Sequence, residues 1–249
     1  MSETTFHFAG DLYIQPYVNG VLGGMIGPID AESLEIKPDA KKNTIQSKAK
    51  ATAGQARITY YTPQPATISI KTSDIPPTML AAAFMGNEVT VNQGAGTLTD
   101  VAVTLPPSPK WVSIGKSNIA QVGLTVKEGA TALAATDYEV NYALGLIRAT
   151  AGGTVKEGGA VTISGTYNAI TGSRIEGNLT PAIDAKLLLD GKNVIDGSPV
   201  KVSVPKASLS PKNGVDFLSE KAIEITLEGE LMVVTGETAP FYVDQLATA

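Results

Sequence analysis

Apolar and polar positions alternate in short segments along the chain, and turn-forming residues separate these segments. The segments are rich in Val, Ile, Thr and Tyr, and several show the period of two that is expected of a strand with one buried face. The clearest cover residues 66–71, 121–127, 160–168, 183–189, 199–207 and 222–234. The pattern predicts a mainly β protein built from many short antiparallel strands.

One segment has the pattern of a helix. Pro76 and Pro77 suit a first helical turn, residues 79–85 are apolar nearly all round, and Gly86 can end the helix. We therefore predict a buried helix at about residues 76–85. The apolar run 79–85 is also the longest in the chain, and it is far shorter than the ~20 residues that cross a bilayer. No membrane location is expected.

Residues 39–56 are polar and basic and show no strand period, although strand-like segments flank them. Six basic residues against Asp39 alone give residues 37–57 a charge of +5, which leaves −10 for the rest of a chain of net charge −5. We interpret residues 39–56 as a long loop, and loops of this length are usually functional or disordered.

Three interpretations of the basic loop remain open. It is a solvated segment, a nucleic-acid-binding segment, or a contact with the acidic surface of a neighbouring subunit, since complementary charge fixes how subunits meet. The loop contains no aromatic residue for base stacking, which argues against nucleic acid. We favour the subunit contact.

A change in sequence character marks off a second domain. The prolines at 106, 107 and 109 suggest a linker, and residues 137–140 and 146–149 suggest the two strands of a hairpin. We predict a core domain of residues 1–105 and 170–249, interrupted by a small β-sandwich-like domain of residues 106–169.

Residues suited to catalysis or metal binding are scarce. The chain has no Cys, and His7 is its one histidine. It has neither a G-x-S-x-G nucleophile motif nor a phosphate-binding G-x-x-x-x-G-K-[ST] loop, and its acidic residues lack the spacing of a calcium loop. We expect no enzyme activity, no catalytic residues, no metal and no cofactor.

Glu224, Glu228 and Glu230 fall on one face of the predicted strand at 222–234. Such a row of like charges is either a solvated face or a surface that must not bind a polyanion, because like-charge repulsion lowers the affinity for nucleic acid.

Several stretches, taken in order, resemble the major tail tube proteins of long non-contractile-tailed phages. The resemblance lies in strand-and-turn phrases and their order, and it covers most of the chain. The phrases are residues 34–39 before the Lys-rich loop, 65–72 before the Ala-rich helix, 137–140, 172–178, 187–193, 201–204 and 215–218.

The resemblance implies a structural protein. Its core would be an antiparallel β-sandwich or barrel with one flanking helix, the inserted domain would lie on the outer surface, and six copies would close into a ring. The rings would stack into a hollow tube through which DNA is ejected. The implied partners are other copies of the chain, the tail initiation, tape measure and terminator proteins of the phage, and DNA passing through the lumen without specific binding. The implied location is the virion tail, assembled in the bacterial host cytoplasm.

On this hypothesis the basic loop makes the contact between stacked rings, through Lys41, Lys42, Lys48 and Lys50. The acidic row would line the lumen.

A rival hypothesis belongs to a different class of protein. In it the chain is a soluble two-domain β protein that binds a carbohydrate or a surface partner, and Trp111, Tyr138 and Tyr142 stack on sugar rings.

Overall fold

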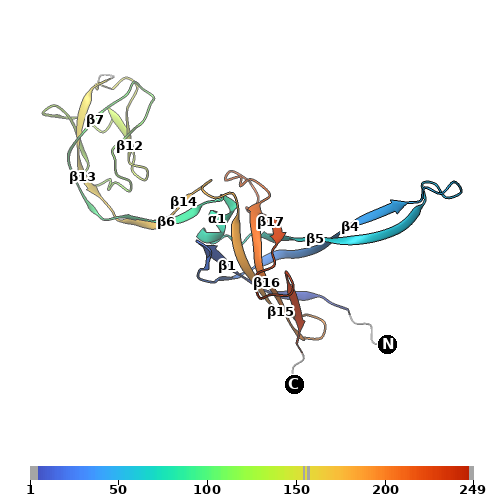
Figure 1. Ribbon diagram of the computed structural model, residues 1–249. Coiled ribbons are helices and arrows are strands. Elements are labelled where there is room, and N and C mark those ends of the chain that lie inside the picture. Colours follow the sequence, from blue (N-terminus) through green and yellow to red (C-terminus); the bar gives the residue numbers. More distant parts are fainter. Residues whose placement is uncertain (1–4, 154, 156–157, 247–249) are drawn as a thin grey trace. The chain divides into compact units, whose positions relative to one another are not determined.

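The computed structural model describes residues 5–153, 155 and 158–246. The chain divides into two compact units, which we call the core unit (Met1–Glu88 and Ile175–Ala249) and the inserted unit (Val89–Arg174). Strands dominate both units, and the described residues contain one α-helix (Figure 1). The prediction of a mainly β protein is confirmed.

Nine strands of the core unit form one sheet in the order β2-β1-β15-β16-β17-β5-β4, with β3 paired to β1 and β18 paired to β16. Each of these pairings is antiparallel. The strands are β1 (Phe8–Val18), β2 (Val21–Leu22), β3 (Ile26–Ile29), β4 (Ala31–Gln46), β5 (Ala56–Thr72), β15 (Ile183–Asn193), β16 (Pro199–Pro211), β17 (Ile225–Leu231) and β18 (Tyr242–Gln245).

This sheet has one apolar face and one polar face. In β17, Ile225, Leu227 and Leu231 are buried, whereas Glu228 and Glu230 lie on the opposite side. Buried residues of β1, β5, β15 and β16 join the same apolar cluster. Full burial of an aliphatic side chain contributes roughly 1.5–3 kcal/mol, and a slip by one residue would move the whole set into water. The alternation therefore fixes the register of the strands.

The helix α1 (Pro77–Ala83) packs on the apolar face against β16 and β17, where Met79 and Ala83 enter the core cluster. It lies within the predicted range 76–85, which confirms that prediction. The Gly86 N–H donates to the carbonyl of Ala81 and closes the helix end. A Cβ at Gly86 would collide with the backbone of Glu176, so this position requires glycine.

The inserted unit contains a four-stranded sheet β10-β9-β13-β7 and a three-stranded sheet β11-β12-β8, and the two-stranded ribbon β14-β6 connects it to the core unit. Both sheets contribute side chains to a single buried cluster, as in a β-sandwich. The strands are β6 (Asn87–Gln93), β7 (Gly96–Thr104), β8 (Val112–Ser113), β9 (Thr125–Glu128), β10 (Thr131–Ala132), β11 (Tyr138–Asn141), β12 (Leu146–Ala149), β13 (Ala160–Tyr167) and β14 (Ile170–Glu176).

The predicted hairpin in this unit is confirmed, because β11 pairs with β12 from Tyr138 opposite Ala149 to Asn141 opposite Leu146. The predicted domain limits, 106–169, differ from the observed ones. β7 pairs along its length with β13 of the inserted unit, and Leu105 is buried in the same cluster. The prolines after Leu105 therefore lie in a loop inside this unit and not in a linker. The alternating pattern of residues 96–104 identifies a strand but does not identify its partner.

The two cores can be tested separately because the single tryptophan of the chain, Trp111, lies in the inserted unit. Ile147 is fully buried there, so Ile147→Ala should lower the free energy of unfolding of that unit by about 2–5 kcal/mol. The measurement is urea unfolding followed by Trp111 fluorescence. Val122→Ala, at a side chain that is 90% exposed, is the control and should leave the transition in place. Equal effects of the two substitutions would contradict the assigned core.

Candidate assembly surfaces

The strands β4 and β5 form a hairpin that extends well beyond the sheet (Figure 1). β17 pairs with β5 only between Thr67 and Thr72, whereas β4 and β5 continue to pair with each other from Asp39 opposite Gln64 to Gln46 opposite Ala56. We call residues 39–64 the projecting hairpin. Both outer edges of its two strands are unpaired in the described chain.

The interpretation of residues 39–56 as a long structureless loop is therefore wrong. Residues 39–46 belong to β4, Ala56 begins β5, and only residues 47–55 form the connecting loop. The loop is closed by backbone hydrogen bonds from the Ser47 N–H to the Gln55 carbonyl and from the Gly54 N–H to the Ser47 carbonyl. The strand period is absent from the sequence because neither face of the ribbon packs on the core.

Prolines mark the point at which the hairpin leaves the sheet. Pro38 lies at a register shift between Lys37 and Asp39. In β5, Pro65 lies opposite this shift, and Pro63 pairs with Ala40. Proline lacks the N–H that a further strand would need and is usual at sheet edges and bulges. The pairing of β17 with β5 accordingly ends before this point.

The projecting hairpin has two different faces. Ile45 lies directly opposite Ile58, and Asn43 lies directly opposite Tyr60, so these side chains share one face. Ile45, Ile58 and Tyr60 are 49%, 51% and 51% exposed, and we call these three residues the apolar face of the hairpin. The opposite face carries Thr44 and Thr59, with Tyr61 opposite Lys42.

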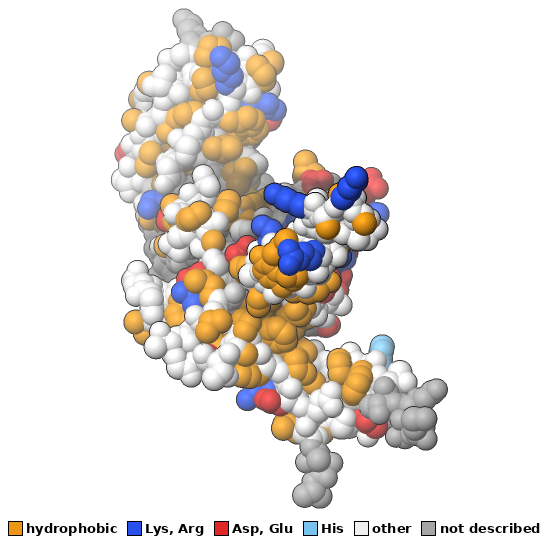
Figure 2. Space-filling model, turned by 45° about the vertical axis from the view of Figure 1, so that its right-hand side comes forward, with side chains coloured by type: hydrophobic (Ala, Val, Ile, Leu, Met, Phe, Trp, Pro, Cys, Tyr) orange, Lys and Arg blue, Asp and Glu red, His pale blue; other side chains and the backbone are white. Residues whose placement is uncertain are grey.

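The projecting hairpin is also strongly basic. Residues 40–66 contain no acidic residue and five basic ones. The four lysines predicted to make the contact between rings all lie on the hairpin: Lys41 and Lys42 on opposite faces of β4, and Lys48 and Lys50 in the connecting loop. Figure 2, in which the hairpin points forward, shows Lys and Arg side chains gathered around its end.

A two-stranded ribbon alone in water is marginally stable. The projecting hairpin combines this weakness with exposed apolar side chains and a concentration of like charge. It therefore leaves apolar side chains and basic charge exposed in the described chain.

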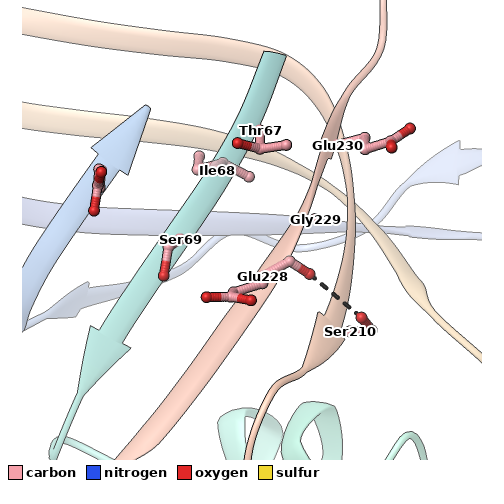
Figure 3. A pocket seen from close by; sticks show the side chains of 8 residues that line it. Thr67, Ile68, Ser69, Ser210, Glu228, Gly229 and Glu230 are labelled. Carbon is pink, nitrogen blue, oxygen red and sulfur yellow. Dashed lines mark hydrogen bonds between the residues drawn. The ribbon is translucent and has the colours of Figure 1, made fainter. Parts of the chain in front are cut away.

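The predicted acidic row lies on the polar face of the core-unit sheet. Glu228 lies beside Ser69 and Ser210 and Glu230 beside Thr67 on the adjacent strands, around a shallow pocket of about 380 Å³ (Figure 3). Ser210 Oγ donates to the backbone carbonyl of Glu228 at 3.4 Å. Glu224 precedes β17, and its carboxylate is bound by Lys71 of the same face.

Lysines neutralise part of this acidic row. Lys71 Nζ lies 2.8 Å from carboxylate oxygens of both Glu224 and Glu32, and these hydrogen bonds raise the pKa of Lys71 to about 12. Lys212 pairs with Glu228 in the same way. Among the described residues, the ion pairs leave Glu230 without a basic partner. The strand period revealed which glutamates share a face but gave no sign of these lysine partners, of which Lys71 lies in β5 and Lys212 follows β16.

The aromatic residues considered for sugar stacking lie in the inserted unit. Tyr138 and Tyr142 are partly buried against its core. The guanidinium of Arg148 stands 4.6 Å from the centre of the Trp111 ring and is bound to Glu139. Arg148 thus ties the Trp111 segment to the β11–β12 hairpin.

Other kinds of site receive little support from the part of the chain that the structure describes. It contains no group of three or more acidic, His or Cys residues able to hold a metal ion. The backbone N–H of His7 donates to Oδ1 of the buried Asn193, and the residue lies at the surface. No described helix has the length and hydrophobicity to span a membrane.

Comparison with known proteins identifies the family. The chain belongs to the family described as "Protein of unknown function UCP028589", whose model matches residues 5–240. No curated protein matches the chain.

The projecting hairpin should be much less protected from amide hydrogen exchange than the rest of its strands. Residues 67–72 of β5 lie between β4 and β17, whereas residues 57–62 have a partner on one side only. Exchange of the isolated protein, followed by mass spectrometry of peptides from these two segments, should show faster exchange in residues 57–62. Equal protection would show that the hairpin is already covered.

The ion pair between Asp184 and Lys206, 2.8 Å long, should make stability depend on pH. The hydrogen bond from Lys206, assisted by Ser208, holds the pKa of Asp184 below its ordinary value of 3.8. Its stabilising contribution is therefore present above pH 3.8 and is lost as the pH falls through the lower pKa of the folded protein. Urea unfolding on both sides of this value should show a steeper loss of stability for the wild type than for Asp184→Asn. Parallel curves would contradict the assignment.

Proposed function

For this member of a family of unknown function, we propose a structural role as the subunit of a phage tail tube. Copies of the chain associate into hexameric rings, and the rings stack into a tube that conducts DNA during ejection. The chain has no enzymatic role in this proposal and uses no cofactor.

The observation that carries the proposal is the projecting hairpin. It holds a half-exposed apolar face and five basic residues away from the sheet, on a ribbon that contributes no residue to the core clusters of the described chain. The residues outside 37–57 carry a net charge of −10. A neighbouring copy therefore offers charge of the opposite sign to the hairpin. The hairpin therefore provides the contact between rings, with Lys41, Lys42, Lys48 and Lys50 supplying its charge.

The edges of the core-unit sheet support the association within a ring. β4 pairs with β5 on one side, and no described strand pairs with its other side. An exposed edge of 16 residues would otherwise promote aggregation, and pairing with the sheet of an adjacent copy satisfies its backbone groups. Repetition of one such heterologous contact closes a ring when the rotation between copies closes.

The polar face of the sheet is suited to line the lumen. It presents Ser, Thr and Glu side chains, including Glu224, Glu228 and Glu230, without a deep cleft at these positions. Lys212 balances Glu228, and the single charge of Lys71 is shared between Glu224 and Glu32, so this face keeps a net negative charge. Glu35 and Glu230 have no basic partner among the ion pairs of the described residues. DNA then passes without the phosphate contacts that produce non-specific binding.

The partners that follow from this role are other copies of the chain and the tail initiation, tape measure and terminator proteins of the phage. The site of action is the virion tail, after assembly in the cytoplasm of the bacterial host.

Reversal of the hairpin charge tests the proposal. The quadruple variant with Lys41, Lys42, Lys48 and Lys50 replaced by Glu should remain a folded monomer, because all four side chains are exposed, but should form no tubes. Electron microscopy of the purified protein, alone and with the tail initiation proteins, measures tube formation, and circular dichroism checks folding.

The control carries the same change of charge elsewhere, with Lys110, Lys127, Lys192 and Lys221 replaced by Glu. It should form tubes as the wild type does. Normal tubes from the hairpin variant would rule out its role in stacking, and a wild-type protein that never forms rings or tubes with its tail partners would refute the proposed function.

A further inference from the structure

We propose that the apolar face of the projecting hairpin docks into one defined groove of a second copy, the groove between α1 and the end of β1. The inference rests on the proposed self-assembly, and it adds the receiving surface and the face of the hairpin that enters it.

The groove encloses about 620 Å³ within the core unit. Its floor consists of core residues of the sheet and helix, among them Ile14, Met79 and Leu209. The turn after β1, with Val18 and Asn19, forms one rim. The groove is thus an opening through which side chains from outside can reach the apolar core.

The groove matches the hairpin in polarity and in charge. The groove is lined mainly by apolar residues, so it can bury the exposed side chains of Ile45, Ile58 and Tyr60. The charged residues that line the groove are Glu88 and Asp184, both acidic, although the carboxylate of Asp184 is also paired with Lys206. The charged residues of the hairpin between positions 40 and 66 are all basic. Complementary charge at the rim and apolar contact at the centre is the usual arrangement of a specific interface.

Two other hollows of the core unit match less well. The pocket on the polar sheet face is acidic, but Ser, Thr and Glu side chains dominate its lining, so it would cover apolar side chains poorly. The hollow beside Met25 and Leu188 encloses about 300 Å³ and contains Lys201 as well as Asp190. Of the three, the groove beside α1 alone combines a mainly apolar lining with charged lining residues that are all acidic.

The occupant must come from another copy. The projecting hairpin extends away from α1 and from the end of β1, and its pairing with the sheet holds it in that direction (Figure 1). A contact between two different surfaces of identical chains leaves hairpins free at one end of an open stack and grooves free at the other. Such a contact continues from copy to copy, as a stack of rings requires.

Substitutions on the two faces of one strand separate the apolar contact from the effect of charge. Ile58→Glu and Thr59→Glu introduce the same charge at adjacent exposed positions whose side chains point to opposite faces. Ile58→Glu should raise the protein concentration at half-assembly about tenfold or more, whereas Thr59→Glu should change it little. Light scattering and sedimentation measure this concentration. Equal effects of the two variants would overturn the choice of face.

Cross-linking identifies the receiving surface, since the chain has no natural cysteine. Protein carrying Ile58→Cys is mixed with protein carrying Val18→Cys at the groove, Thr67→Cys at the polar pocket or Met25→Cys at the third hollow, and a short bismaleimide is added. A product between Ile58→Cys and Val18→Cys, but not with the other two, is expected.

The outcomes distinguish this inference from the proposed function. Tubes that form normally while Ile58→Cys links to Thr67→Cys or Met25→Cys, or to none of the three, overturn the groove and leave the tube function standing. Protein that links Ile58→Cys to Val18→Cys but never forms rings or tubes supports the groove and refutes the tube function.

Discussion

The antiparallel pairing of β4 with β5 is the interaction on which the proposed assembly depends. Near the core, β5 is bonded on both sides, to β4 and to β17, and its apolar residues are buried. The same pairing continues outward past Asp39 and Gln64 without a third strand. Because strand pairing fixes which side chains share a face, the register set in the buried half also sets which side chains lie on each face of the exposed half. The buried half of β4 and β5 thus determines how the projecting hairpin is oriented, although the projecting hairpin contributes no residue to the core cluster.

The two surfaces of the core unit have opposite electrostatic characters. The hairpin concentrates basic residues without acidic partners, so its charge is available to another molecule. On the polar sheet face, by contrast, Lys71 and Lys212 already occupy the carboxylates of Glu224 and Glu228. Exposed ion pairs of this kind contribute little to stability, but they lower the net charge that an approaching ligand meets. In the proposed tube, the hairpin is the surface for binding another copy, and the sheet face is the one past which DNA moves.

The sequence predicted those features that local pattern determines. The helix followed from Pro76 and Pro77 before an apolar run, and the β11–β12 hairpin from two strand-like segments with a short connection. The shared face of Glu228 and Glu230 followed from the alternation of polar and apolar positions along β17. These inferences need only the neighbouring residues. They required no knowledge of which distant segments meet.

Features set by distant partners were missed. Residues 96–104 look like any half-buried strand, and only their pairing with β13 assigns them to the inserted unit. Residues 39–46 lack a strand period because they are outside the apolar cluster of the described residues, although Ile58, Tyr60 and Tyr61 favour a strand on the other side of the hairpin. The lysine partners of the acidic row likewise lie far away in sequence. An alternating pattern of apolar and polar residues indicates a strand with one face buried in its own chain. It gives no indication of a strand whose two faces are both exposed in that chain.

The paired strands β6 and β14 bring the entry and exit of the inserted unit next to each other. Because β6 and β14 pair with each other, the described residues of the inserted unit contribute no strand to the core-unit sheet. Evolution could therefore lose this module, or exchange it for an unrelated domain whose own ends are adjacent, while the sheet, α1 and the projecting hairpin are kept. Variation between related chains at this position would change the inserted unit and leave the core unit unchanged.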